Sequence, residues 1–204
     1  AKKGQFYLTE GQRSMANNSA VYNSQPSAEE FLDEWTALVK SRSGERGIFN
    51  RAGLEKQLPT RRWEAIKNER QIGLNPCGEI YLRSKQFCNL TSIVVRPDDT
   101  VATLKRKIEL STLLGTYQST LTNFGYLSKK WKENCDAERL LGVSLTGYYD
   151  NPIIRDDKVL DTLKAYSVEV NKKYAKRFNI NASTAITCVK PHGNSGQLLG
   201  VGSG

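Results

Sequence analysis

A cysteine and a glutamate lie two residues apart in a stretch that favours a tight turn. Cys77 and Glu79 are separated by Gly78, Pro76 precedes the thiol, and Asn75 precedes the proline. Proline and glycine disfavour a helix interior, so we expect a loop that can present the thiol to a cavity. A thiol beside a carboxylate could serve nucleophilic catalysis, with Glu79 as the base. The same residues could instead form a structural turn around a buried cysteine.

Two further segments carry groups that could take part in chemistry. Cys88 lies eleven residues after Cys77 and opens a run rich in β-branched residues. A loop of small residues is expected at about 190–196, after the last apolar run of the chain. Such a loop leaves backbone N–H groups accessible, which suits a phosphate. Its candidate binding residues are Pro191, His192, Gly193, Asn194 and Ser195.

The four cysteines are Cys77, Cys88, Cys135 and Cys188, and none forms a C-x-x-C pair. With a single histidine in the chain, we expect no zinc or other metal site. The first residues lack the apolar core of a secretory signal, so a cytoplasmic location is expected, where thiols are more often reduced or catalytic than structural.

The composition is that of a globular protein, with 204 residues of which 38% are hydrophobic and 25% charged. No run approaches the ~20 apolar residues of a membrane span. The net charge of +9 is spread along the expected helices, and its clusters are interpreted as solvated helix faces. No nucleic-acid-binding motif is recognisable, so direct binding of DNA or RNA is not expected.

Apolar periodicity predicts strands that alternate with helices, which favours an α/β fold with parallel strands. A capping box of Ser27 and Glu30 begins a helix over 27–42, whose buried face is expected to hold Phe31, Trp35, Leu38 and Val39. The core side of a helix over 101–122 is expected to hold Leu104, Ile108, Leu110, Leu113, Leu114 and Tyr117. The remaining expected elements are strands at 19–22, 48–50, 89–95, 140–147 and 184–189 and a helix over 156–178.

These motifs together resemble the catalytic, large subunit of ribonucleotide reductase, in its adenosylcobalamin-dependent class II branch. The resemblance rests on Asn75-Pro76-Cys77-Gly78-Glu79-Ile80, on Cys88-Asn89-Leu90 and on Val189-Lys190-Pro191-His192-Gly193-Asn194-Ser195. Gln12-Arg13, Asn17-Asn18-Ser19 and the run over 141–147 also match the pattern of this family. The likeness covers nearly all of the chain, in order.

The resemblance implies a fold and a set of residue roles. The fold is part of a ten-stranded α/β barrel with a central finger loop, here about 73–87. Cys77 at the fingertip carries a transient thiyl radical that removes the 3′ hydrogen of a ribonucleotide. Glu79 takes the 3′-hydroxyl proton and Asn75 binds the sugar hydroxyls. Cys88 is one of two reducing thiols, and the loop at about 190–196 holds the substrate phosphates.

The family also implies a cofactor and partners. The cofactor is adenosylcobalamin, and the partners are the ribonucleotide substrate, complementary reductase segments and an external thiol reductant such as thioredoxin. The location is the cytoplasm of a bacterium or of a phage-infected host. Residues 1–204 are expected to be the central barrel segment alone, without the early strands that carry the partner thiol of Cys88 and without the C-terminal cysteines.

The sequence therefore leaves three candidate functions. The first is a ribonucleoside di- or triphosphate reductase segment that is active with the missing segments. The second is a nucleotide-binding fragment without catalytic activity, favoured by the absent partner thiol. The third is a thiol hydrolase, which the lack of a histidine near Cys77 in the sequence disfavours.

Overall fold

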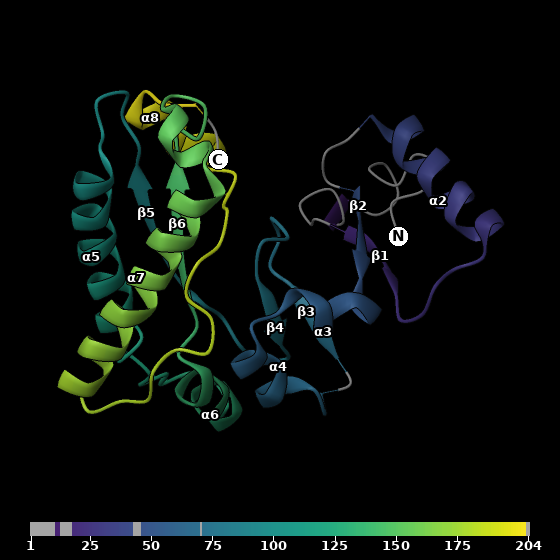
Figure 1. Cartoon of the computed structure of the whole chain (residues 1–204). Helices are drawn as coiled ribbons and strands as arrows, with labels where there is room; N and C mark the ends of the chain where they lie inside the picture. The colour runs from purple at the N-terminus through teal and green to yellow at the C-terminus, as the bar shows by residue number, and fades with distance from the viewer. Residues whose placement is uncertain (1–10, 13–17, 43–45, 70, 203–204) are drawn as a thin grey trace. The chain divides into compact units, whose positions relative to one another are not determined.

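A computed structural model of the chain describes residues 11–12, 18–42, 46–69 and 71–202. The chain forms two compact units, Ala1–Trp63 and Glu64–Gly204, and each is described by itself (Figure 1). None of the described helices is long and apolar enough to cross a membrane.

The first unit is a β-α-β arrangement. Strands β1 (Asn18–Tyr22) and β2 (Arg46–Asn50) pair in parallel, with Ala20 opposite Ile48. Helix α2 (Ala28–Ser41) connects them, and the Ser27 hydroxyl caps it by accepting the Glu30 amide at 3.1 Å. Two short helical turns, η2 (Arg51–Gly53) and α3 (Leu54–Gln57), follow, and α4 (Thr60–Ile66) leads into the second unit.

The predicted buried face of α2 is wrong for this chain. None of the residues of α2 is buried, and Phe31, Trp35 and Val39 are 38%, 49% and 57% exposed. A sheet of two strands is too narrow to cover a helix of 14 residues. The helix instead contacts its sheet through an ion pair between Glu34 and Arg46 at 2.6 Å.

The second unit contains a hairpin and an α/β layer. Strands β3 (Ile72–Leu74) and β4 (Tyr81–Arg83) pair antiparallel. Strands β5 (Asn89–Val94) and β6 (Leu141–Thr146) pair in parallel. Helices α5 (Val101–Gln118) and α7 (Asp157–Arg177) pack on them, as Figure 1 shows. The remaining elements are α6 (Lys129–Glu138), η3 (Pro152–Arg155) and α8 (Gly193–Leu199).

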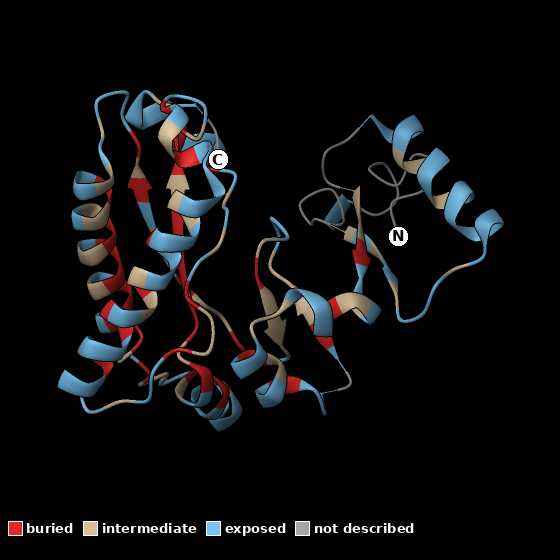
Figure 2. Cartoon of the chain, viewed as in Figure 1, coloured by how far each residue is buried: buried red, intermediate tan, exposed pale blue. Residues whose placement is uncertain are grey.

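The core of the second unit lies between these strands and helices, where Figure 2 shows most of the buried residues. It is a single cluster of aliphatic side chains contributed by β5, β6, α5, η3, α7 and the segment after α7. Its members are Ile93, Val95, Leu104, Ile108, Leu141, Val143, Ile154, Leu163 and Ile186.

Helix α5 faces this core differently from the prediction. Leu104 and Ile108 are buried as expected, but Leu110, Leu114 and Tyr117 are 50%, 58% and 54% exposed. The rest of the inner face consists of small or hydroxyl side chains, at Ser111, Thr112, Gly115 and Thr116. Gly115 lies against the sheet, where a Cβ would be in ordinary van der Waals contact with Leu141 at 3.5 Å and with Thr91 at 3.6 Å. Small and hydroxyl side chains therefore line the part of α5 that packs on β5 and β6.

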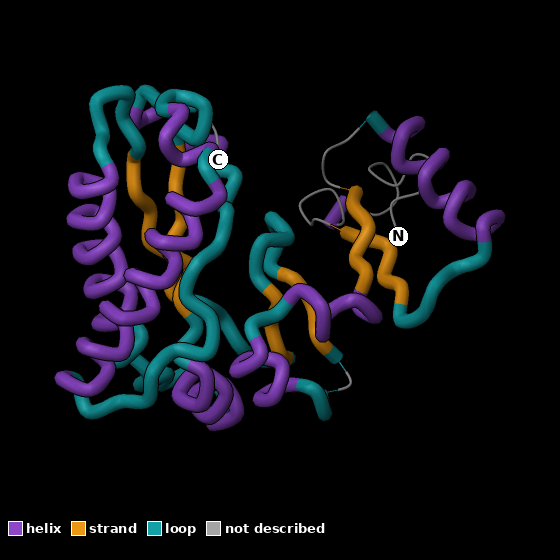
Figure 3. The backbone as a smooth tube through the Cα atoms, in the orientation of Figure 1, coloured by secondary structure: helices purple, strands orange, loops and turns teal. Residues whose placement is uncertain are grey.

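The expected strand at 184–189 does not form, and Figure 3 shows this segment as loop. It lies along β6 and makes one parallel bridge, between Val143 and Thr187. The amides of Leu141 and Val143 donate to Ala185 and Ile186 at 3.1 and 2.8 Å. Two residues of β6 thus span one residue of the segment, and this irregularity interrupts the ladder.

The residues that the structure describes do not close into a barrel. The described strands form three separate sheets of two strands each. The fold is therefore a mixed α/β segment, in agreement with the predicted class but without the ten-stranded closure.

Candidate active site

The hairpin of β3 and β4 presents the sequence motif at its tip. The Gly78 amide donates to the Asn75 carbonyl at 3.0 Å, which closes a four-residue turn with Pro76 and Cys77 at its centre. Asparagine first, proline second and glycine fourth are the preferences of a type I turn. Gly78 has a φ of 83°, in the left-handed region that glycine adopts without strain. The predicted tight loop is confirmed.

The three candidate groups of the tip have different surroundings. Cys77 is exposed. The Glu79 side chain is 5% exposed, and both of its carboxylate oxygens are buried without a hydrogen-bond partner. The Asn75 side-chain oxygen accepts the Ile80 amide at 2.9 Å. That bond fixes the side chain of Asn75 at the base of the turn.

Lys190 links the tip to the segment after α7. Its Nζ atom lies 3.9 Å from the Cys77 sulfur and 3.6 Å from Oε1 of Glu79. The Lys190 amide donates to the Ser144 hydroxyl at 2.9 Å, which fixes the residue beside the end of β6. A thiol, a carboxylate and a cation thus meet at one point, although the chain separates Cys77 and Lys190 by 113 residues.

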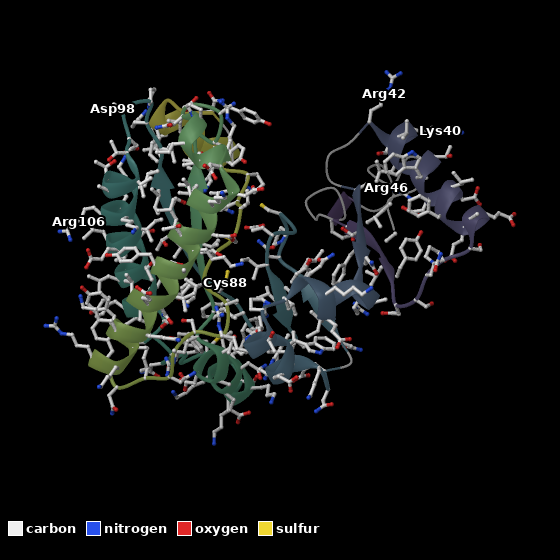
Figure 4. All side chains as sticks on the ribbon, viewed as in Figure 1. Lys40, Arg42, Arg46, Cys88, Asp98 and Arg106 are labelled. Atoms are coloured by element: carbon white, nitrogen blue, oxygen red, sulfur yellow. The ribbon has the colours of Figure 1, made fainter. Side chains whose placement is uncertain are left out.

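Two further thiols lie in the same unit. Cys88 directly precedes β5 (Figure 4), and Cys188 lies beside β6, where its amide donates to Val143 at 3.1 Å. Burial raises the pKa of Cys188 to about 12, with smaller contributions from the nearby Cys88 and Glu79. The Cys188 thiol is therefore neutral at physiological pH. Neither Cys88 nor Cys188 is in a disulfide, and both are of intermediate exposure.

His192 lies beneath the predicted phosphate loop and is 4% exposed. Its ring nitrogens lie 3.2 Å from the Ser144 hydroxyl and 3.0 Å from the Ser195 hydroxyl, and Ser92 also lies within 3.4 Å. Burial lowers the pKa of His192, and the charge of Lys190 adds to this effect. The imidazole therefore holds the loop to β5 and β6 as a neutral ring.

The predicted loop at 190–196 is partly helical, because α8 begins at Gly193. His192 precedes it with a φ of 56°, which turns the chain from the extended segment into the helix. Pro191, Gly193, Asn194 and Ser195 are exposed, whereas His192 is buried. Any contact of His192 with a ligand would therefore involve its backbone, since its ring faces the three serines.

Glu138 fixes the base of the hairpin. Its side chain is 1% exposed and lies 3.1 Å from Nε of Arg83, the last residue of β4. Gln86 donates to it at 2.7 Å and Thr184 at 2.9 Å. One buried carboxylate at the end of α6 therefore joins the finger hairpin to the segment that carries Cys188 and Lys190.

The structure brings Asn75, Cys77 and Glu79 together on one turn, with the segment that begins at Lys190 beside them. Sequence reasoning included Lys190 within a motif but gave it no role, although it is the one lysine or arginine in the stretch 188–196. It also missed Ser144 and Glu138, whose types and local spacing carry no such signal. Of the motif near the N-terminus, Arg13 and Asn17 lie outside the described residues, and Gln12, Asn18 and Ser19 belong to the first unit.

Comparisons with known proteins give two related findings. The chain is 27% identical to an adenosylcobalamin-dependent ribonucleoside-triphosphate reductase of Lactobacillus gasseri, over 94% of the chain and 28% of that reductase. A crystal structure of a B-12-dependent (class II) ribonucleotide reductase superposes on 98% of the chain and 32% of its own length, with a TM-score of 0.69 and 24% identity. No protein-family profile matches the chain. The chain thus spans about a third of the length of these relatives or less.

Proposed function

Because the chain is related in sequence and fold to adenosylcobalamin-dependent class II ribonucleotide reductases, we propose that it is the central catalytic segment of such an enzyme. Its reaction is the reduction of a ribonucleoside di- or triphosphate to the 2′-deoxyribonucleotide for DNA synthesis. Its activity depends on complementary segments, since the described strands of this chain form separate two-stranded sheets that do not enclose the fingertip in a barrel.

The fingertip supplies the groups that start this chemistry. Cys77 carries the thiyl radical and takes the hydrogen atom from the 3′ carbon of the substrate. Glu79 accepts the proton of the 3′-hydroxyl, and the Asn75 amide binds the sugar hydroxyls. The buried carboxylate of Glu79 supports this role, because its oxygens accept no hydrogen bond from the described residues and can receive a substrate hydroxyl.

The later steps need two thiols. The 2′-hydroxyl leaves as water, and Cys88 with a second thiol supplies two electrons and two hydrogens as the pair closes to a disulfide. The second thiol comes from a complementary segment, and an external dithiol such as thioredoxin reduces the disulfide for the next turnover. The substrate phosphates bind at Pro191–Ser195, through the exposed backbone of Gly193 and the side chains of Asn194 and Ser195.

The cavity of about 310 Å³ in the second unit does not suit adenosylcobalamin at Cys77. It is lined by side chains of α5, β6 and α7 such as Ile108, Leu145 and Leu163. Cys77 is not among its lining residues, so this cavity cannot place a cofactor beside the thiol. We assign the cofactor surface to complementary segments and derive no step of this chain's own chemistry through it.

One observation carries the proposal. A hairpin turn places a thiol and a buried carboxylate side by side and within 4 Å of the same lysine, on a chain related to class II reductases. A structural turn would be expected to bury the cysteine and expose the carboxylate, which is the reverse of the arrangement of Cys77 and Glu79.

The test is a reductase assay on the reassembled enzyme. The chain is mixed with the polypeptides from the same genome that supply the other barrel segments and the cysteine tail. Adenosylcobalamin, a dithiol and each ribonucleoside di- and triphosphate are added, and deoxyribonucleotide is measured by chromatography. We expect product with the wild-type chain, none with Cys77→Ser, and loss of dithiol-dependent turnover with Cys88→Ser.

Two results decide against this function. Product from the Cys77→Ser chain would overturn the radical role. Binding of nucleotide without product in the reassembled wild-type complex would favour the nucleotide-binding fragment over the enzyme.

A further inference from the structure

The residue that joins the fingertip to the rest of the site is Lys190. We propose that Lys190 is a positioning residue whose ammonium group holds the Cys77 thiol and the Glu79 carboxylate in one arrangement. This inference rests on the proposed function for its place in a reaction, but its test does not require reductase activity.

The Glu79 carboxylate is buried, with a side chain that is 5% exposed, and it accepts no hydrogen bond from the described residues. Such a charge is costly unless a cation lies nearby. The Lys190 ammonium is 3.6 Å from Oε1, so it supplies the compensating charge. A charged Glu79 is also the form that can accept a proton.

Lys190 is held at its backbone and is partly exposed at its side chain. Its side chain is 29% exposed, so its charge remains partly solvated. Its backbone is held by Ser144, and the next buried residue is His192, whose ring binds the same serine. The lysine therefore extends from a fixed point beside β6 and reaches the tip of a hairpin that has no backbone pairing with β6.

Lys190 also affects the pKa values of Cys188 and His192. Lys190 lowers the pKa of Cys188, against the larger effect of burial, and lowers the pKa of His192 in the same direction as burial. Glu79 acts in the opposite sense on both residues. The pair thus acts on one thiol and one imidazole, and removal of either charge leaves the other uncompensated.

The test measures alkylation of Cys77 by iodoacetamide in the full chain at neutral pH. Peptide mass spectrometry resolves Cys77 from the other cysteines. The variants are Lys190→Met, Lys190→Arg, Glu79→Gln and the double variant of Lys190→Met with Glu79→Gln. Lys172→Met, which removes an exposed lysine of α7, is the matched control. Far-UV circular dichroism confirms that each variant folds.

We expect Lys190→Met to slow alkylation about threefold to sixfold, the effect of removing a unit charge about 4 Å from a thiolate in a largely aqueous setting. Lys190→Arg should restore the rate to within about twofold of wild type, and Lys172→Met should leave it unchanged. Glu79→Gln should accelerate alkylation. The factor for Glu79→Gln should differ between the wild-type and Lys190→Met backgrounds, because the two charges interact.

A wild-type rate in Lys190→Met overturns the proposal, as does an equal loss of rate in Lys172→Met. The proposal is also overturned if the alkylation rate of the double variant changes by the product of the two single-variant factors, because the two charges then do not interact. If the alkylation results hold while the reassembled enzyme makes no product, the proposed function fails and the role of Lys190 at the fingertip stands. If the reassembled enzyme makes product and alkylation of Cys77 is insensitive to Lys190, the role of Lys190 fails and the proposed function stands.

Discussion

Removal of the Glu138 carboxylate should unfold the connection between the finger hairpin and the α/β layer. The Glu138→Ala substitution removes the buried partner of the Arg83 guanidinium, whose side chain is 12% exposed and which keeps only its pair with the more exposed Glu69 at 3.6 Å and its bond to the Ala65 carbonyl. It also removes the acceptor for Gln86 and for Thr184. Breaking a buried ion pair by removing one partner costs about 3–5 kcal/mol, which is larger than the ~1 kcal/mol of an exposed pair. We therefore expect a loss of about 3–5 kcal/mol in the free energy of unfolding.

Urea denaturation followed by tryptophan fluorescence measures this loss, since Trp131 lies in α6 close to Phe87, with ring centroids 6.1 Å apart. Glu138→Gln should cost less, because the amide keeps the shape and one acceptor oxygen. The matched control is Glu133→Ala on the same helix, where the side chain is 62% exposed and its pair with Lys130 spans 3.6 Å. If Glu138→Ala loses no more than Glu133→Ala, the hairpin is not held by this network and the reasoning is refuted.

Three further predictions concern the core, the turn after β6 and the Cys188 thiol. Leu104→Ala should lower the unfolding free energy, measured by urea denaturation, by about 2–5 kcal/mol because Leu104 is fully buried. Leu114→Ala, at a site that is 58% exposed, should change it by less than ~1 kcal/mol. Equal losses would contradict the observed face of α5. Gly147→Ala should cost about 1–3 kcal/mol, because Gly147 has a φ of 83° and a Cβ there would lie 2.8 Å from the carbonyl oxygen of Val95; a neutral effect would show that the turn can rearrange. The pKa of Cys188 is raised from 9.0 to about 12, so the neutral thiol stabilises the folded state fully below pH 9, and this stabilisation is lost as pH rises toward 12. Between pH 8.5 and 10.5 the unfolding free energy of the wild type should therefore fall by up to about 2 kcal/mol more than that of Cys188→Ser. Parallel pH profiles of unfolding free energy for the two proteins would contradict this.

The local elements could be predicted because their signals lie within a few residues. Proline and glycine around Cys77 predict the turn, and the β-branched run after Cys88 predicts β5, which the structure places at Asn89–Val94. Ser27 predicts the start of α2 through its side-chain oxygen. Each of these features depends on backbone preferences or caps that neighbouring residues determine.

The contacts that complete the site could not be predicted, because their partners are far apart in the chain. Glu138 is an ordinary helix residue until its contacts with Gln86 and Thr184, 52 and 46 positions away, are known. The errors on α2 and α5 have a related cause, since apolar periodicity identifies a face but not what covers it. Leu114 is exposed because Gly115 takes the position nearest to β6.

The 113 residues between Cys77 and Lys190 also set an order of events during protein synthesis. The turn at the fingertip needs hydrogen bonds that span five residues or fewer, so it can form soon after the ribosome releases it. At about 5–20 residues per second, Lys190 follows Cys77 by about 6 to 23 s. The nascent hairpin therefore exists for seconds as a bare thiol and carboxylate, and the lysine joins them late, once β6 has been made and the segment after α7 lies along it.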